Sequence, residues 1–284
     1  MDLINKLEIN LNFGEYIKIN HEKIEELIYF HKKSEIFKDY KPYDWSDENF
    51  YLEKDHYSPE EISNFFTIGN SINFKYWDKK NKKIIYCEGE KKRVHFKGAQ
   101  YMWRCLKNAI EDDLYPLLSP KELISISKKD FINIFSDDNG SNPFYMSMNE
   151  RIKNLQDLGK KLSKNWDDNF LNLLNSTNHS VIDFVQKCRN IKAFDDPLCK
   201  LTMVNAILHT GRGLYHFNQP LFPGIDYQLM KQMLRIGAVL PDKNTSKKLK
   251  RRLILDDQEG AEIRNATLEV FRRVMKKTEI PGEY

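Results

Sequence analysis

Apolar residues recur at helical spacing along most of the chain, and capping residues mark where the helices begin. In the segment from 222 to 237, the apolar positions lie three or four residues apart: Ile225, Leu229, Met233 and Ile236. This period predicts an amphipathic helix with one face in the core. Pro223 and Gly224 break the preceding structure, so Asp226 is predicted at or beside the N-cap of that helix.

Other helix starts carry the same kind of signal. Ser58 is followed by a proline and, three residues on, by Glu61, which together form a capping box that opens a helix to about Phe74. Further caps are predicted at four places: Ser119 with Glu122, Ser147 with Glu150, Ser180 with Asp183, and Asp196 with Pro197. A last long helix is predicted from Glu259 to about Thr278. The chain is therefore predicted to be mainly α.

One β signal interrupts the helices. Ile84 to Cys87 and Val94 to Phe96 are rich in β-forming residues and flank a Glu-Gly-Glu turn, which predicts a small β-hairpin. The polar and basic stretch 242–257 is predicted to be a connector before the last helix. We therefore expect an N-terminal helical region with a β-hairpin, residues 1–115, and a helical core, residues 116–284, in one compact unit.

Composition narrows the class of protein. The chain has 284 residues and a mass of 33.8 kDa, enough for one large or two small domains. With 40% hydrophobic, 30% charged and 12% aromatic residues, it has the composition of a folded globular protein and not of a disordered one. A formal charge of +4 is too small to indicate nucleic-acid binding by itself.

The cysteines and the N-terminus narrow the class further. The four cysteines form no CxxC pair and have no metal-ligand spacing with the seven histidines, so we expect neither a metal nor a cofactor. The N-terminus has no basic segment followed by an apolar one, and no stretch is long and apolar enough to cross a bilayer. We expect a soluble cytoplasmic protein with reduced thiols.

The position predicted for Asp226 suits a catalytic carboxylate. Backbone N–H groups and the positive end of the helix dipole favour its ionised form. A fixed negative charge of this kind can stabilise a cationic transition state. Aspartates at helix starts also serve as caps alone, so the residues leave both roles open.

The same helix carries the pattern D-x-x-L-x-K-x-x-x-R-I-G, which runs from Asp226 to Gly237. It resembles the VDTHVxRVxxRLG segment of the helix-hairpin-helix DNA glycosylase superfamily, in which the aspartate is the catalytic carboxylate. Tyr227 and Gln228 stand where that superfamily has Thr and His, and no LPGVGxKTA hairpin lies upstream. The resemblance implies a glycosylase-like helical fold with Asp226 as its catalytic residue.

Further segments resemble, in the same order along the chain, the queuosine salvage protein family, a branch of that superfamily. They are NFF at 64–66, SINF at 71–74, YW at 76–77, GAQYMWRCLKNAI at 98–110, LLSP at 117–120, ERIKNLQDLGKKL at 150–162, AFDD at 193–196 and EIRNAT at 262–267. The resemblance implies an enzyme that hydrolyses the N-glycosidic bond of queuosine 5′-monophosphate, a small nucleotide, and releases queuine for tRNA modification.

The resemblance also implies roles for the two aspartates. Asp226 would stabilise the positive charge that develops on the ribose when the bond breaks. A 7-deaza base lacks N7, the usual protonation site of a departing purine, so the enzyme has to contact another part of the base. Asp196, which matches the aspartate of the family's SFRD segment, would provide that contact or a second carboxylate. As an Asp-Pro pair at a helix start, it is equally well a cap.

Seven residues are expected to contact the substrate: His56, Asn73, Trp77, Phe194, Lys200, Tyr227 and Lys231. Phe194 can stack on the base or pack in the core, and His56 can contact the base or lie exposed in a loop. Lys231 is a candidate contact for the 5′-phosphate. A basic cluster is either a second phosphate-binding candidate or a solvated segment: Lys243, Lys247, Lys248, Lys250, Arg251 and Arg252.

Lys200 leaves a second function open. The segment from Asp196 to Thr202 also resembles the DPxxKT segment of archaeal 8-oxoguanine DNA glycosylases, in which a nearby lysine is the Schiff-base nucleophile. The alternative is therefore a DNA glycosylase that excises an oxidised purine and has nucleic acid as its partner. A third hypothesis is that the protein is a non-catalytic relative that binds a nucleotide or RNA.

Overall fold

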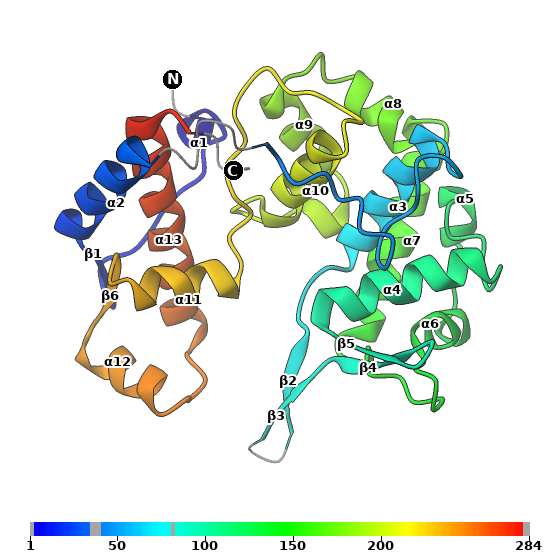
Figure 1. Cartoon of the computed structure of the whole chain (residues 1–284), viewed down its shortest axis with the longest axis horizontal. Helices are drawn as coiled ribbons and strands as arrows, with labels where there is room; N and C mark the ends of the chain where they lie inside the picture. Colours follow the sequence, from blue (N-terminus) through cyan, green and yellow to red (C-terminus); the bar gives the residue numbers. More distant parts are fainter. Residues whose placement is uncertain (1–2, 35–40, 81–82, 281–284) are drawn as a thin grey trace. The chain divides into compact units, whose positions relative to one another are not determined.

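A computed structural model describes residues 3–34, 41–80 and 83–280 (Figure 1). Over these residues the chain is mainly helical, with three antiparallel pairs of short strands. This confirms the predicted fold class, a mainly α chain with a small β-hairpin in its N-terminal half. The likeness to helix-hairpin-helix glycosylases stays a prediction.

The contacts within the chain group it into two compact units. Unit 1 is drawn from residues 1–42, 196–207 and 217–284, and unit 2 from residues 43–195 and 208–216. These boundaries differ from those expected for the regions 1–115 and 116–284, because both ends of the chain contribute to unit 1. Residues 1–2 and 281–284, at the outer ends of the two expected regions, lie outside the described residues.

Unit 1 is built around one long helix, α13. Its elements are α1 (Leu3–Lys6), β1 (Ile17–Ile19), α2 (His21–Lys33), the first part of α10 (Lys200–Gly211), α11 (Tyr227–Arg235), β6 (Val239–Pro241), α12 (Lys243–Lys250) and α13 (Asp257–Thr278). Strands β1 and β6 pair antiparallel, with Ile17 opposite Pro241. Apolar side chains of β1, α2 and β6 pack against Ile263 and Val270 of α13, and Figure 1 shows α2 beside α13.

A capping box starts α13, and a buried carboxylate ties it to the N-terminal segment. Glu259 N donates to Asp256 Oδ1 at 2.9 Å, and Asp256 N donates to Glu259 Oε2 at 3.1 Å. Glu262, which is buried, accepts from the N–H groups of Tyr16 at 2.9 Å and of Ile17 at 3.1 Å. The first residue of the EIRNAT segment therefore has a structural role, since it satisfies N–H groups at the start of β1.

The prediction that residues 242–257 form only a connector was wrong. The stretch contains α12, which is capped by Asp242 through a hydrogen bond from Thr245 N to its Oδ1 at 2.7 Å. All residues of α12 except Leu249 are polar, so no apolar period marks the helix. Its cap and the bond from Thr245 Oγ1 to Glu259 of α13, at 2.9 Å, hold it instead.

Unit 2 surrounds a buried helix, α3. Its elements are α3 (Pro59–Ser71), β2 (Trp77–Lys80), β3 (Lys83–Tyr86), β4 (Glu88–Lys91), β5 (Val94–Lys97), α4 (Gly98–Glu111), α5 (Pro120–Leu123), α6 (Lys128–Phe135), α7 (Met148–Asn165), α8 (Phe170–Asn175), α9 (Val181–Cys188), η2 (Lys192–Phe194) and the end of α10. The predicted capping box at Ser58 is confirmed. Every residue from Ile62 to Ser71 is buried, as expected for a helix with neighbours on all sides.

The hairpin prediction was partly wrong. Glu88 to Glu90, expected as a turn, belong to β4, which pairs with β5, while β3 pairs with β2. The turn between β4 and β5 is made by Lys92 and Arg93, both with positive φ (50° and 64°). Their N–H groups donate to the carboxylate of Asp138 at 3.2 and 2.8 Å. A distant carboxylate thus stabilises a turn that has no Asn-Gly signal.

The other predicted capping serines lie before helices, but not all of them make a capping hydrogen bond. Ser180 accepts from Asp183 N, as expected for a cap. Ser119 and Ser147 precede α5 and α7 but make no side-chain capping bond, and Ser147 has a left-handed φ of 51°. Among the described helices, none combines the length and apolarity that a membrane crossing requires.

Candidate active site

Asp226 is the N-cap of α11, as predicted. Gln228 N and Leu229 N both donate to its Oδ1, at 2.9 and 3.0 Å. Within the part of the chain that the structure describes, no hydrogen bond reaches Oδ2. The carboxylate is half-buried, so one oxygen is fixed by the helix while the other is left for a ligand.

The turn before Asp226 packs directly on the first turn of α10. A Cβ added at Gly224 would lie 2.6 Å from Val204 Cγ2 and 2.7 Å from the carbonyl oxygen of Lys200. Any larger residue would push the two segments apart, so the glycine is needed for this close approach. The contact brings the start of α11 next to the start of α10.

Lys200 lies at this contact with its side chain half-buried. Burial lowers the pKa of its amino group, and the negative charge of Asp226 acts in the opposite direction. The structure therefore brings together two of the residues predicted for the site. A lysine with a lowered pKa is both a stronger acid and a better nucleophile than an exposed one.

Asp196, the second predicted carboxylate, is fully engaged. Arg264 donates from Nη1 to Oδ1 at 3.2 Å and from Nη2 to Oδ2 at 2.6 Å. The backbone N–H groups of Leu198 and Lys200 donate to the same two oxygens at 3.2 and 2.9 Å. Burial works to raise the pKa of this carboxyl, but the hydrogen bonds and charge of Arg264 outweigh it and hold the pKa below its usual value.

The helix predicted to open at Asp196 begins four residues later, at Lys200. The intervening residues form a turn in which Cys199 N donates to the Asp196 carbonyl oxygen at 2.7 Å. Cys199 has a left-handed φ of 53°, which separates the turn from the helix. Asp196 reaches across the turn to Lys200 N, so the capping signal was correct and the boundary was wrong.

Arg264 is a site residue that the sequence prediction missed. Its Nε donates to the carbonyl oxygen of Ile225 at 3.2 Å, while its two terminal nitrogens hold Asp196. One guanidinium from α13 thus connects the start of α10 to the residue before Asp226. The available signal was the EIRNAT segment at 262–267, in which Arg264 is the only cation.

Tyr227 and Lys231 are exposed on α11. Tyr227 follows Asp226 and is 48% exposed, and Lys231 lies one helical turn further on. Both side chains are exposed and therefore accessible to a ligand. Their predicted roles in substrate binding stay predictions.

Asn73 and Trp77, predicted substrate contacts, lie in unit 2 on the segment after α3. Asn73 Oδ1 accepts from Tyr76 Oη at 2.8 Å, and its Nδ2 donates to Asn70 Oδ1 at 3.2 Å. Trp77 begins β2 opposite Tyr86 and is half-buried. The segment is therefore held in one conformation by its own polar contacts.

Arg151 of α7 fixes the same segment from the core. Its side chain is fully buried, with Nε donating to Ile72 O at 3.2 Å and Nη2 donating to the carbonyl oxygens of Phe74 and Lys75. The guanidinium also lies 3.9 Å from the ring centre of Phe144. Burial lowers its pKa to about 10, so it remains charged near neutral pH. The ERIKNLQDLGKKL segment thus supports the SINF segment.

Phe194 and His56 differ in accessibility. Phe194 is fully buried in η2, so its ring packs in the core of unit 2 and presents no free face for stacking. The side chain of His56 is 71% exposed and lies 3.2 Å from Glu53. Of these two predicted substrate contacts, only His56 is open to a ligand.

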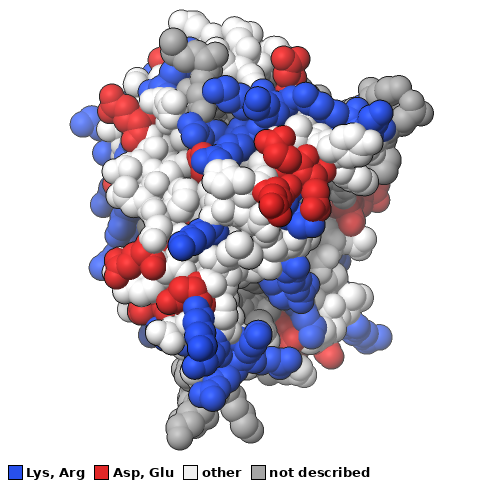
Figure 2. All heavy atoms as spheres, turned by 90° about the vertical axis from the view of Figure 1, so that its left-hand side faces the viewer, with Lys and Arg blue, Asp and Glu red and all other residues white. Residues whose placement is uncertain are grey.

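The predicted basic cluster lies on α12 and the turn after it. Lys248 is held by Glu259 at 2.7 Å and by Asp256 at 3.4 Å, and the rest of the cluster is exposed: Lys243, Lys247, Lys250, Arg251 and Arg252. Figure 2 shows one face of the molecule, on which Lys and Arg side chains form separate groups with Asp and Glu beside them. Over the described residues, no group of three His, Cys, Asp or Glu side chains is placed to hold a metal ion.

Comparison with known families adds one finding. The family model described as queuosine salvage protein matches residues 52–201, which is more than half of the 284-residue chain. No curated protein matches the chain. The matched range includes Asn73, Trp77, Asp196 and Lys200 and ends before Asp226. The case for Asp226 therefore rests on the geometry of its surroundings and not on the family match.

Proposed function

The chain belongs to the queuosine salvage protein family, and from this premise we propose that it hydrolyses the N-glycosidic bond of queuosine 5′-monophosphate or a related 7-deazaguanine nucleotide. The family implies a role in queuosine salvage and a small nucleotide-like substrate. The proposed reaction breaks the bond between the base and C1′ of the ribose, adds water at C1′, and releases queuine.

The arrangement of Asp226 carries the proposal. Breaking a glycosidic bond builds positive charge on C1′ and O4′, so a carboxylate fixed beside the sugar lowers the barrier. The two N–H groups at the start of α11 fix Oδ1, and Oδ2 has no hydrogen-bond partner among the described residues. We assign Oδ2 to the sugar or to the attacking water, which it can orient and deprotonate.

Lys200 is our candidate for assisting the departing base. The leaving nitrogen gains negative charge as the bond breaks, and a nearby proton donor stabilises it. The amino group of Lys200 lies close enough to Asp226 to feel its charge, and burial lowers its pKa. Lowering the pKa of a lysine brings its proton-donating range nearer to neutral pH.

Asp196 and Arg264 are proposed to position the site. All four contacts to the Asp196 carboxylate come from donors of the protein itself, which leaves it poorly suited to exchange a proton with substrate. Arg264 holds this carboxylate and the Ile225 carbonyl together. In this proposal, Tyr227 and Lys231, which lie on α11 after Asp226, bind the remainder of the nucleotide.

A second candidate function rests on Lys200. A half-buried lysine with a lowered pKa is what a Schiff-base nucleophile requires. This observation favours a DNA glycosylase that excises an oxidised purine such as 8-oxoguanine, with Asp226 in support. In that reaction the lysine forms a covalent bond to C1′, and borohydride reduces and traps the adduct.

One experiment separates the two functions. The purified protein is incubated with queuosine 5′-monophosphate and, in parallel, with duplex DNA that contains 8-oxoguanine, and the free base is measured by mass spectrometry. The proposal predicts free queuine from the nucleotide and no base from the DNA. Base released only from the DNA, together with borohydride trapping that is lost in Lys200→Ala, would establish the second function. Binding without base release from either substrate would leave a non-catalytic relative.

A further inference from the structure

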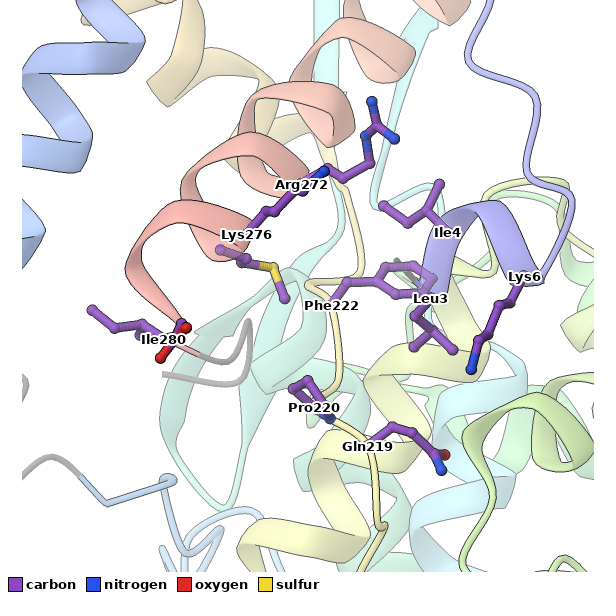
Figure 3. A pocket seen from close by; sticks show the side chains of 11 residues that line it. Leu3, Ile4, Lys6, Gln219, Pro220, Phe222, Arg272, Lys276 and Ile280 are labelled. Carbon is purple, nitrogen blue, oxygen red and sulfur yellow. The ribbon is translucent and has the colours of Figure 1, made fainter. Parts of the chain in front are cut away.

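A pocket of about 440 Å³ lies in unit 1. The residues that line it do not include those of the candidate active site: Asp196, Lys200, Gly224, Asp226 and Arg264. Its walls come from α1, from the segment just before Pro223 and from the last turns of α13 (Figure 3). The volume lies in the range of small-molecule sites. The pocket is therefore a candidate for a second ligand site.

Apolar side chains form the inner wall of the pocket. Phe222 is 2% exposed and Ile4 is 3% exposed, so both are held firmly by the core. Figure 3 shows the ring of Phe222 directed toward α1, with Leu3 and Ile4 on that helix. Met275 adds a polarizable side chain from α13. Leu3 and Met275, which are half-buried, are apolar side chains of this wall that a ligand can reach, and they favour an apolar ligand body.

Cations from two elements line the same pocket. Lys6 ends α1 and Lys276 lies in the last turns of α13, and no ion pair is formed by either lysine within the described residues. A third cation, Arg272, is held by Glu269 through two hydrogen bonds, at 2.5 and 2.9 Å. The two lysines therefore remain available for an anionic group of a ligand.

The pocket also offers acceptors. Glu279, which is exposed, follows α13 as its C-cap in a left-handed conformation with a φ of 59°, and it is one of the residues that line the pocket. N–H groups on one edge of a ligand would pair with the carboxylate oxygens of Glu279.

We propose that this pocket binds a nucleoside 5′-monophosphate whose base carries N–H groups, with guanine as the base that fits best. The flat base would lie on the apolar wall beside Leu3 and Met275, its N–H edge would face Glu279, and the phosphate would bind Lys6 and Lys276. A fatty acid supplies the apolar body and the anion but no N–H donors. A free phosphate supplies only the anion. The proposal concerns binding and does not depend on hydrolysis at Asp226.

The test uses the full chain with ¹³C-labelled methionine methyl groups and GMP as the probe. Titration with GMP is expected to shift the methyl resonance of Met275, which lines the pocket, and to leave that of the fully buried Met203 unchanged. The same shift is expected in the Asp226→Asn variant. Decanoate serves as the fatty-acid probe and is expected to bind more weakly than GMP.

Two neighbouring lysines provide matched variants. Lys276→Glu removes a cation of the pocket and is expected to weaken GMP binding by about tenfold, the loss of one charge-assisted contact. Lys277→Glu makes the same charge change on the next residue, which does not line the pocket, and is expected to bind GMP as the wild type does. Equal weakening by both variants, tighter binding of decanoate, or no shift of Met275 would overturn the proposal. None of these outcomes bears on base release from queuosine 5′-monophosphate.

Discussion

The segments that lead into α10 and α11 each carry an aspartate, and the two carboxylates are used differently. Asp196 accepts hydrogen bonds on both oxygens, two of them from Arg264. Asp226 accepts two on Oδ1 and, among the described residues, none on Oδ2. The difference shows that a capping position does not by itself identify a catalytic carboxylate. The oxygen that the fold leaves without a partner identifies the better candidate.

Arg264 makes this difference possible. Its guanidinium binds Asp196 and the Ile225 carbonyl, and so holds one helix start while it leaves the carboxylate of the other untouched. Gly224 brings the same two segments into contact. In our account, Asp196, Arg264 and Gly224 position the site, and Asp226 and Lys200 act on the substrate.

The largest effect is expected for Asp226→Asn. Under the proposed function, the rate of base release falls on the order of a thousandfold, because the negative charge that stabilises the transition state is lost. The fold is retained, since Asn caps a helix about as well as Asp. The matched control is Asp242→Asn, which changes the cap of α12 in the same way and leaves the rate unchanged. Equal rates for the two variants would remove Asp226 from the mechanism.

The next effect concerns stability. Asp196→Asn and Arg264→Met are each expected to lower the free energy of unfolding by about 2 kcal/mol, because each leaves a half-buried partner without its charged contact. The double variant should lose little more than either single one. Urea unfolding measures the free energy of unfolding of all three variants. Lys97→Met, which breaks an exposed pair with Glu88, should cost clearly less.

Gly224→Ala tests the contact between the two helix starts. The added methyl group would displace α10 from the segment before Asp226, and we expect the rate of base release to fall by about tenfold to a hundredfold. Gly260→Ala is the control, because a Cβ at this position in α13 meets nothing within 4 Å. That variant should keep the wild-type rate and be slightly more stable. A wild-type rate for Gly224→Ala would show that the close packing is not needed.

The smallest effect concerns acid stability. The folded-state pKa of Asp196 lies below its ordinary value of 3.8, so between these two pKa values the unfolded chain binds more protons and stability rises with pH. The contribution of Asp196 is therefore fully present above pH 3.8 and is lost as the pH falls through its folded pKa. Urea midpoints measured below pH 5 should fall less steeply for Asp196→Asn and for Arg264→Met than for the wild type. Parallel curves for all three proteins would contradict the assignment.

The sequence could predict the parts of the site that depend on local contacts. The caps at Ser58, Ser180 and Asp226 join residues within three positions of one another, so a short pattern contains both partners. The pairing of Asp196 with Arg264 joins residues 68 positions apart, and nothing in either local pattern names the other. The sequence around Asp196 was therefore equally compatible with a cap and with a catalytic group.

The errors in the predicted fold also come from contacts between residues far apart in the sequence. The turn at Lys92 and Arg93 needs Asp138, which lies about 45 residues away, so the expected turn was placed on the nearest glycine. Helix α12 depends on its cap and on a bond to Glu259 and lacks an apolar face. The burial of Phe194 also depends on the packing of the whole unit. The sequence alone therefore could not decide whether its ring packs in the core or stacks on a base.

The most direct test of the account follows the bond that is broken. Queuosine 5′-monophosphate is incubated with the wild-type protein in H₂¹⁸O, and both products are analysed by mass spectrometry. The account predicts unlabelled queuine and ribose 5-phosphate that carries ¹⁸O at C1′ when it is analysed before exchange with the solvent, with neither product formed by Asp226→Asn. Labelled inorganic phosphate without free queuine, or full activity in Asp226→Asn, would contradict it.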